Sequence, residues 1–388
     1  MSGALLCSFL LLGLLFQVSS SLYSLKKASA QGRVLIWKIS LDMIKERPLV
    51  GFGYGNFEHM YNLHQSVYFK NTSATAQEKQ NAGYVKMAYN EFLQNTVEGG
   101  IPALVLFGGL LISLIMVNPS IITLTENTGP QSGNFIQNNT AIIAYSGIVA
   151  FTTMSLVNFT VQAIPAMALA VLYMAILALN ERCHFRWKLN MPVKTTFAIV
   201  LITGGVFLGY NMVYRAMAHY RNKEAAQLLK LNRANEALEI LLPLEPELNN
   251  SESYWRNLGN TYYTRKELIK AITAYNKAKL LSSNPELYSK AAFCYLLTSN
   301  YPEAEKNYKT AAFIEPRRLV HRVVLMKLYM KIHRFREAAA MAHQILALEP
   351  KNPSKKSDSY KQQAKEVISR LGAQVMDTNE IHKSTNKL

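Results

Sequence analysis

The stretch WRNLGNTYYTRKELIKAITAYNKAKLL, residues 255–281, decides the fold of the C-terminal half of this chain. Its central alanine, Ala271, belongs to a series of four alanines that are separated by 34, 33 and 34 residues. The series is Ala237, Ala271, Ala304 and Ala338. Self-similarity at this period predicts a solenoid of stacked helical units.

The units resemble the tetratricopeptide repeat. The opening stretch matches its pattern at Trp255, Leu258, Gly259, Tyr262, Ala271, Tyr275 and Ala278. The next unit repeats it through Tyr288, Ala291, Ala292, Tyr295, Ala304, Tyr308, Ala311 and Pro316, and a fourth is looser. Small residues let two helices approach closely, and tyrosines and leucines fill the space between hairpins. Since no unit can bury its face alone, at least three must stack. The unit at 218–249 is degenerate, and we expect it to continue the preceding apolar segment as a helix.

The N-terminal half is apolar instead. A membrane-spanning helix needs about 20 apolar residues. Five segments qualify approximately: 5–18, 101–117, 141–157, 164–179 and 195–214. The first resembles a signal-peptide core but lacks a basic region before it, so we favour a retained span. The three cysteines lie far apart and suggest neither a disulfide framework nor a metal site.

The predicted fold class is therefore all-α, a polytopic transmembrane bundle of about five spans followed by an α-solenoid. We expect a membrane domain at 1–214 with a large outer loop at 19–100, helical repeats at 215–372 and a polar tail at 373–388. A further helix is expected at 359–371, as a cap of the solenoid. Five spans place the large loop and the repeats on one side of the membrane. Basic residues lie on both sides, so charge leaves the orientation undecided.

The large loop carries the remaining motifs. Val34, Ile36/Trp37, Leu41 and Ile44 form a helix-like apolar stripe, and Pro48 ends the element. GFGYG follows at 51–55. No strand is predicted before it, so a dinucleotide-binding reading is rejected. A tight turn beside the membrane is the alternative, with backbone N–H groups that suit phosphate contact.

A resemblance to a known family is carried by four short stretches: Gly32-Arg33, Trp37, RPLVGFGYGNF at 47–57 and YNEFLQNTVEGGIPA at 89–103. Over roughly residues 20–180 the chain resembles the C-terminal half of the O-antigen ligase and Wzy-type polymerase family. The family's motif is a histidine, then Asn, Ser or Gln, nine residues, and Gly-x-x-Gly. Here Asn90 is followed by nine residues and Gly100, but Tyr89 replaces the histidine and Ala103 the last glycine. Members usually have many more spans, so the resemblance implies that much of an N-terminal half is missing.

The resemblance implies transfer of a glycan from an undecaprenyl-diphosphate carrier to an acceptor hydroxyl, without cofactor or metal. Guanidinium groups would stabilise the diphosphate leaving group. Arg33 matches the family's arginine, although a structural or headgroup role is the alternative. A phenol is a poor base because its pKa is near 10. Glu91 could act as the base, or Tyr89 could only orient the acceptor, or be an interfacial aromatic. The candidate catalytic residues are Arg33, Tyr89, Asn90 and Glu91, and the candidate substrate-binding residues are Arg47, Gly51, Gly53 and Gly100.

Three functions follow. The first is a bacterial inner-membrane glycan ligase or polymerase, whose loop and repeats face the periplasm. Its acceptor would be a glycan or a lipid A-core-like molecule, and its repeats would bind a protein. The second is a non-enzymatic membrane-anchored scaffold for polysaccharide assembly. The third is a ligase that glycosylates a protein hydroxyl. The net charge of +17 suits an acidic protein partner, anionic glycans or a solvated surface, and we expect no nucleic acid.

Overall fold

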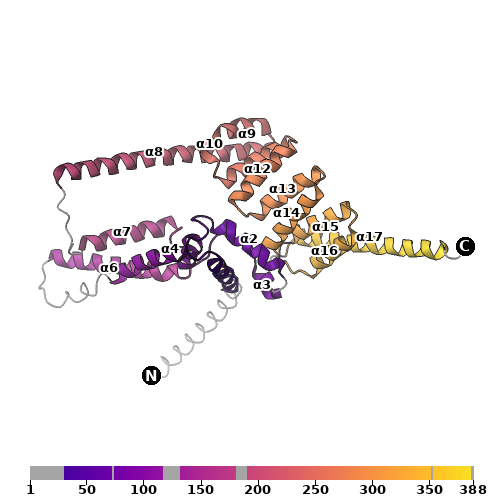
Figure 1. Ribbon diagram of the computed structural model, residues 1–388, viewed down its shortest axis with the longest axis horizontal. Coiled ribbons are helices and arrows are strands. Elements are labelled where there is room, and N and C mark those ends of the chain that lie inside the picture. The colour runs from indigo at the N-terminus through magenta and orange to yellow at the C-terminus, as the bar shows by residue number, and fades with distance from the viewer. Residues whose placement is uncertain (1–29, 72–73, 117–131, 181–189, 351–352, 386–388) are drawn as a thin grey trace, which may run out of the picture. The chain divides into compact units, whose positions relative to one another are not determined.

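The computed structural model of the chain describes residues 30–71, 74–116, 132–180, 190–350 and 353–385. Every regular element in these ranges is a helix, which confirms the all-α fold class. The chain forms two compact units, Met1–Leu177 and Ala178–Leu388. Figure 1 labels their helices in chain order.

The first unit contains a helix at 30–46, then α2 (Phe57–Lys70), α3 (Ala76–Asn81), α4 (Glu91–Met116), α6 (Ser132–Ser155) and α7 (Ile164–Asn180). The helix predicted before Pro48 is confirmed, and its predicted apolar stripe is right only in part, because Ile36 is buried but other members are not. Val34 and Leu41 are exposed, and the buried face is made by Leu35, Ile36, Ile39 and Met43. Ile36, Ile39 and Met43 recur at steps of three and four residues, as one face of a helix requires, and Leu35 lies one turn before Ile39 on the same face.

Helices α4, α6 and α7 pack on one another through apolar side chains. Leu111, Phe151 and Ala170 form one buried cluster, with one residue from each helix. Ala144, Ile148 and Leu177 form a second cluster between α6 and α7. Their outward faces carry many exposed apolar residues, as expected of helices surrounded by lipid.

Two helices in the described residues are long and apolar enough to cross a membrane, α4 and α8 (Met191–Lys230). Shorter apolar helices lie at Thr140–Ser155 and Ile164–Ala178. The segment at 5–18 lies outside the described residues. The expected number of about five spans is therefore not confirmed, although the two long helices are consistent with a membrane protein.

The second unit begins with α8 and continues as paired helices. They are α9 (Ala234–Leu241), η1 (Leu242–Leu244), α10 (Glu245–Leu248), α11 (Glu252–Thr264), α12 (Leu268–Leu281), α13 (Pro285–Leu297), α14 (Tyr301–Ile314), α15 (Leu319–Lys331), α16 (Phe335–Ala347) and α17 (Lys355–Thr385). The repeat alanines Ala237, Ala271, Ala304 and Ala338 are all fully buried. A Cβ atom on Gly259 would clash with the Tyr275 ring, so a small residue is required there.

Each hairpin turns at a residue with positive φ. These residues are Asn232 (φ 59), Lys266 (φ 63), Ser299 (φ 60) and His333 (φ 58). The next residue donates its N–H to a carbonyl five positions earlier, as in Arg233 to Leu228 (3.0 Å) and Glu267 to Tyr262 (2.9 Å). This is the Schellman ending of a helix. Because the first, degenerate unit has the same ending, it is structurally a repeat.

Two expected domain boundaries fall inside helices. Residue 214 lies inside α8, because no glycine or proline interrupts the helix between the apolar segment and Lys230. The continuation of the apolar segment into the first repeat is thereby confirmed. At the other end, α17 runs through the boundary placed at 372. Its Ala364 packs against Leu319, Ala342 and Ile345, so α17 covers the last repeat as predicted.

Candidate functional site

The GFGYG turn is built against a break in α4. Gly100 has φ 71 and ψ −171 and separates a first helical segment from the apolar one that follows. The broken helix leaves carbonyl groups without intrahelical partners. Phe52 N–H donates to Val97 O (2.9 Å) and Gly53 N–H to Glu98 O (2.8 Å), while Ile101 N–H donates to Pro48 O (2.7 Å). The turn at 48–53 and the α4 break therefore form one backbone structure.

Glu98 strengthens this connection with its side chain. Glu98 is 7% exposed, and its carboxylate accepts the Phe57 N–H at 3.1 Å. Phe57 is the first residue of α2, and a carboxylate is favourable at a helix N-terminus. Glu98 thus holds the start of α2 against α4. It was not among the predicted site residues, although a carboxylate just before an apolar segment was a visible signal.

The glycines serve this close approach. A Cβ atom on Gly51 would lie 2.5 Å from the carbonyl carbon of Glu98, and one on Gly100 would clash with Leu49 O. Gly51 N–H donates to Arg47 O at 3.2 Å. The backbone donors of Gly51 and Gly53 are therefore occupied by protein carbonyls, and these glycines shape the turn.

Residues 88–91 are held from several directions. Trp37 Nε1 donates to Ala88 O at 3.0 Å. Asn90 Oδ1 accepts the Leu93 N–H at 2.9 Å, which caps the start of α4. Tyr89 has φ 54, an uncommon conformation for a residue other than glycine. The two contacts on either side hold Tyr89 in this conformation.

The turn between α6 and α7, at 156–163, meets three of the predicted catalytic residues. Arg33 Nη1 donates to Val157 O at 2.6 Å. The rings of Tyr89 and Phe159 lie edge to face, with centroids 5.9 Å apart. Glu91 Oε1 accepts the Val161 N–H at 2.8 Å. This turn had no place in the predicted site, and its apolar sequence gives little sign of it.

Arg33 and Tyr89 also contact each other. The guanidinium carbon lies 5.1 Å from the centre of the Tyr89 ring. No carboxylate pairs with Arg33 among the described residues. A guanidinium held by a carbonyl and an aromatic face keeps its positive charge uncompensated, which suits an anionic ligand. The structure thus brings Arg33, Tyr89, Asn90 and Glu91 together at one end of the α4–α6–α7 cluster.

Arg47 lies elsewhere in the unit. Its guanidinium carbon is 4.9 Å from the Phe52 ring, and its side chain is exposed. It lies beside the GFGYG turn, and among the described residues no hydrogen bond or ring contact joins it to Arg33. The two candidate arginines, Arg33 and Arg47, are therefore held by different parts of the first unit.

The loop is further fixed by Lys38. Its Nζ atom donates to Glu78 Oε1 (2.7 Å) and to Tyr68 OH (2.8 Å). These hydrogen bonds, first that to Glu78, raise the pKa of Lys38 above its usual value. They join the helix at 30–46, which carries Arg33, to α2 and α3.

Comparisons with known proteins bear on both units. The repeats align with an Arabidopsis OM64 TPR domain at 24% identity, over 30% of this chain and 95% of that one, with a TM-score of 0.25. They align with the TPR-like repeats of a Podosopora anserina putative kinesin light chain at 16% identity, over 43% and 98%, with a TM-score of 0.33. No curated protein sequence matches the chain.

The sequence model of the O-antigen ligase family matches residues 1–108. This stretch contains every predicted site residue, whereas α6, α7 and the turn between them lie beyond it. The motif-based resemblance is therefore confirmed over residues 1–108, which are similar to the O-antigen ligase family.

Proposed function

We propose that this protein is a membrane glycosyltransferase of the O-antigen ligase or polymerase type. It transfers a glycan from an undecaprenyl-diphosphate carrier to an acceptor hydroxyl on the periplasmic face of the bacterial inner membrane. The observation that carries the proposal is the uncompensated Arg33, held beside Tyr89 at the 156–163 turn. The match over residues 1–108 supports the same class of reaction.

The reaction breaks the bond between the anomeric carbon and the diphosphate oxygen and forms one to the acceptor oxygen, whose proton passes to the departing diphosphate or to water. Negative charge develops on the diphosphate as it leaves. Fixed positive charge there lowers the barrier, since it is in place before the charge develops. In this proposal Arg33 contacts the leaving diphosphate with the guanidinium donors that Val157 O does not occupy.

Glu91 acts as a positioning residue in this proposal. Its side chain is 4% exposed, and its carboxylate already accepts the Val161 N–H. A base must reach the acceptor hydroxyl. A buried carboxylate that is bonded to the 156–163 turn holds that turn in place instead. Of the two roles that the sequence left open, orientation of the acceptor by Tyr89 with charge stabilisation by Arg33 is therefore preferred.

A strain lacking the gene, complemented with the wild type or with Arg33→Ala, tests the proposal. Surface glycans are profiled on a gel, and the abundance of each variant in membranes is measured beside them. We expect Arg33→Ala to reproduce the profile of the null strain at normal abundance. A wild-type profile with Arg33→Ala, in a host whose null strain loses glycan, rejects the proposed chemistry.

A membrane-anchored scaffold is the second candidate. The observation in its favour is Tyr89 at the position where the family has its histidine, together with four stacked repeats. In both candidates the repeats bind a protein partner on the periplasmic side. Protease treatment of intact and permeabilised cells tests this orientation: repeats cleaved only after the inner membrane is opened would contradict it.

A further inference from the structure

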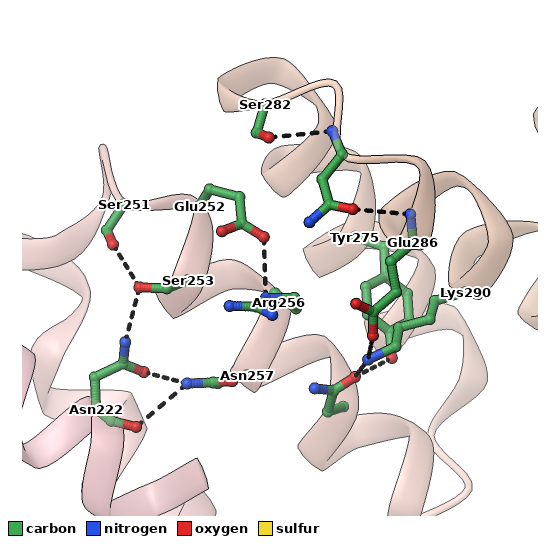
Figure 2. A network of polar contacts seen from close by, with 12 residues as sticks. Asn222, Ser251, Glu252, Ser253, Arg256, Asn257, Tyr275, Ser282, Glu286 and Lys290 are labelled. Atoms are coloured by element: carbon green, nitrogen blue, oxygen red, sulfur yellow. Dashed lines mark hydrogen bonds and ion pairs between the residues drawn. The ribbon is translucent and has the colours of Figure 1, made fainter. Parts of the chain in front are cut away.

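The charged side chains along α11 and α13 largely compensate one another. Arg256 forms an ion pair with Glu252 at 3.0 Å, and Lys290 forms one with Glu286 at 2.9 Å (Figure 2). The surface feature that the packing of the chain leaves unexplained lies in the first unit instead, at the turn 48–54 beside the break in α4.

This turn presents large apolar side chains to the outside. Leu49, Val50 and Tyr54 are 69%, 76% and 68% exposed. Arg47, just before the turn, is exposed too, and in the described part of the chain no carboxylate pairs with it. Exposed apolar residues that lie together mark an interaction surface. A tyrosine and an arginine beside them are typical of the boundary between a membrane and water.

Backbone hydrogen bonding places this surface at the start of the apolar segment of α4. Ile101 N–H donates to Pro48 O at 2.7 Å, and Leu49 and Val50 follow Pro48 directly. Ile101 is itself 45% exposed, and Val105, one turn further along α4, is 63% exposed. The outward apolar face of α4 therefore continues onto the turn, so lipid that covers α4 reaches the turn as well.

The length of this apolar segment fixes the depth of the turn in the membrane. As a helix, residues 101–117 are about 26 Å long. The hydrocarbon core of a bilayer is about 30 Å thick. A span that is shorter than the core has no turn to spare outside it, so Ile101 lies at the boundary of the hydrocarbon. The turn that is bonded to Ile101 lies at the same boundary.

The helical segment before the break folds back toward the membrane. The rings of Phe92 and Phe107 lie edge to face, with centroids 5.2 Å apart. In an unbroken helix these two residues would be about 22 Å apart. The break at Gly100 is therefore the outermost point of α4, and Tyr89, which precedes the first segment, lies on the membrane side of the turn. A turn held in the interface thus keeps Tyr89 and Arg33 close to the headgroup layer.

We infer that the turn at 48–54 inserts Leu49, Val50 and Tyr54 into the interface of the phospholipid bilayer, with Arg47 at the headgroup phosphates. The break in α4 already holds the turn in shape, so little conformational entropy is lost on insertion. The inserted turn fixes the height of this break above the hydrocarbon core. The inference rests on the membrane location that the proposed function requires, and it names the lipid surface on which that site works.

The test measures the depth of the turn in the full chain, reconstituted in nanodiscs of phosphatidylcholine and phosphatidylglycerol. A nitroxide label is attached at Val50→Cys. Electron paramagnetic resonance measures its collisions with oxygen, which partitions into lipid, and with a water-soluble nickel chelate. Leu106→Cys, 75% exposed on α4, is the reference within lipid. Val67→Cys, 58% exposed on α2 and next to the polar contacts of Tyr68, is the reference in water. The native cysteines that are replaced by alanine in all three variants are Cys7, Cys183 and Cys294.

We expect the ratio of oxygen to nickel collisions at position 50 to lie well above that at position 67 and to approach that at position 106. A ratio equal to that at position 67 overturns the inference. So does a label at position 50 that neither reagent reaches, because a protein surface and not lipid then covers the turn. Circular dichroism verifies that each labelled chain folds.

A second variant tests the consequence for the site. Leu49→Asp with Val50→Asp places two carboxylates in the interface, and we expect it to lower glycan transfer by about tenfold at unchanged abundance in membranes. Its matched control is Ile269→Asp with Leu280→Asp, the same change at apolar positions of the repeats that are 68% and 75% exposed. The control is expected to stay within about twofold of wild type. Equal transfer by the variant and the control overturns the positioning of the site by the turn.

The depth measurement needs no glycan transfer, so the insertion and the proposed chemistry fail separately. A chain that transfers glycan while position 50 lies in water overturns the insertion alone. Conversely, an Arg33→Ala chain that keeps the wild-type glycan profile, with position 50 in lipid, rejects the proposed chemistry alone.

Discussion

The guanidinium carbon of Arg33 lies 5.1 Å from the centre of the Tyr89 ring. The helix at 30–46 supplies the arginine, and the tyrosine immediately precedes the cap of α4. Two features distinguish the site from an ordinary helix boundary, and they are in contact. Arg33 is a cation without a carboxylate partner in the described residues, and Tyr89 is an aromatic residue with φ 54.

Arg33→Lys is expected to retain a small part of glycan transfer, about a tenth or less, and Arg33→Ala less still. Lysine keeps the charge but lacks the planar fork that binds phosphate oxygens while also holding Val157 O. The measurement is the surface glycan profile at matched abundance in membranes. Lys45→Ala, at an exposed position of the same helix, serves as the control and is expected to behave as wild type. Equal activity of Arg33→Lys and wild type would contradict a bidentate role.

Tyr89→His restores the residue type of the family motif. Histidine tolerates positive φ better than most residues, so the variant is expected to fold. It adds a base with a pKa near 6.5, and we expect transfer in isolated membranes to rise by about tenfold at pH 7. The increase is expected to fade below about pH 6, where imidazole is protonated. A pH profile identical to that of wild type would show that position 89 does not handle a proton.

Glu91→Gln and Glu91→Ala separate positioning from base catalysis. Glutamine keeps a carbonyl oxygen for the Val161 N–H, so we expect transfer within about threefold of wild type. Alanine leaves that N–H without its partner, at a cost of about 1–3 kcal/mol, and is expected to lower both abundance and transfer. If glutamine abolishes transfer at normal abundance, Glu91 is the base and the positioning role is wrong.

Gly100→Ala is expected to disrupt the first unit. Its φ of 71 disfavours any side chain, and the added Cβ atom would meet the backbone of Leu49. Gly109→Ala is the control, because nothing lies within 4 Å of its Cβ position and its φ is ordinary. Thermal unfolding in detergent is expected to move to lower temperature for the first variant only. An unchanged unfolding temperature for Gly100→Ala would show that the turn at 48–53 adapts.

Lys279 makes the stability of the repeats depend on pH. Burial lowers the pKa of this side chain from 10.5 to about 8. Between these two pKa values Lys279 is protonated in the unfolded chain more often than in the folded one. The free energy of unfolding therefore rises with pH from about 8 to 10.5. Below pH 8 the destabilisation by the buried ammonium group is fully present. Relative to Lys279→Met, the wild type is expected to gain about 1–3 kcal/mol between pH 7 and pH 10. Lys331→Met, at an exposed position, is the control, and a pH-independent difference for Lys279→Met would refute the assignment.

The repeats were predictable because their period is a packing requirement. Ala271, Ala304 and Ala338 recur in the sequence since each faces a neighbouring helix at a point with no room for a larger side chain. The turns carry no such signal. Lys266 and Ser299 adopt positive φ although neither is a residue that favours it strongly, because the packed hairpin imposes the turn.

The positions of the candidate residues along the chain were available from the sequence, but the contacts between them were not. Asn90 and Gly100, which the motif spacing selected, lie at the start and at the break of α4. The 156–163 turn contacts Arg33 and Glu91 because of the way in which α4, α6 and α7 pack. Apolar spans have similar compositions, so the sequence does not reveal which span packs against which. The buried stripe of the helix at 30–46 was misplaced in part for a related reason, since apolar residues lie on both of its faces.

Helix α8 runs without interruption from Met191 to Lys230, about 60 Å. Its first half contains the apolar segment, and its last turns pack against α9 and α11 of the repeats. No joint separates these two parts of the helix, so a rotation of the first repeat turns the apolar segment by the same angle.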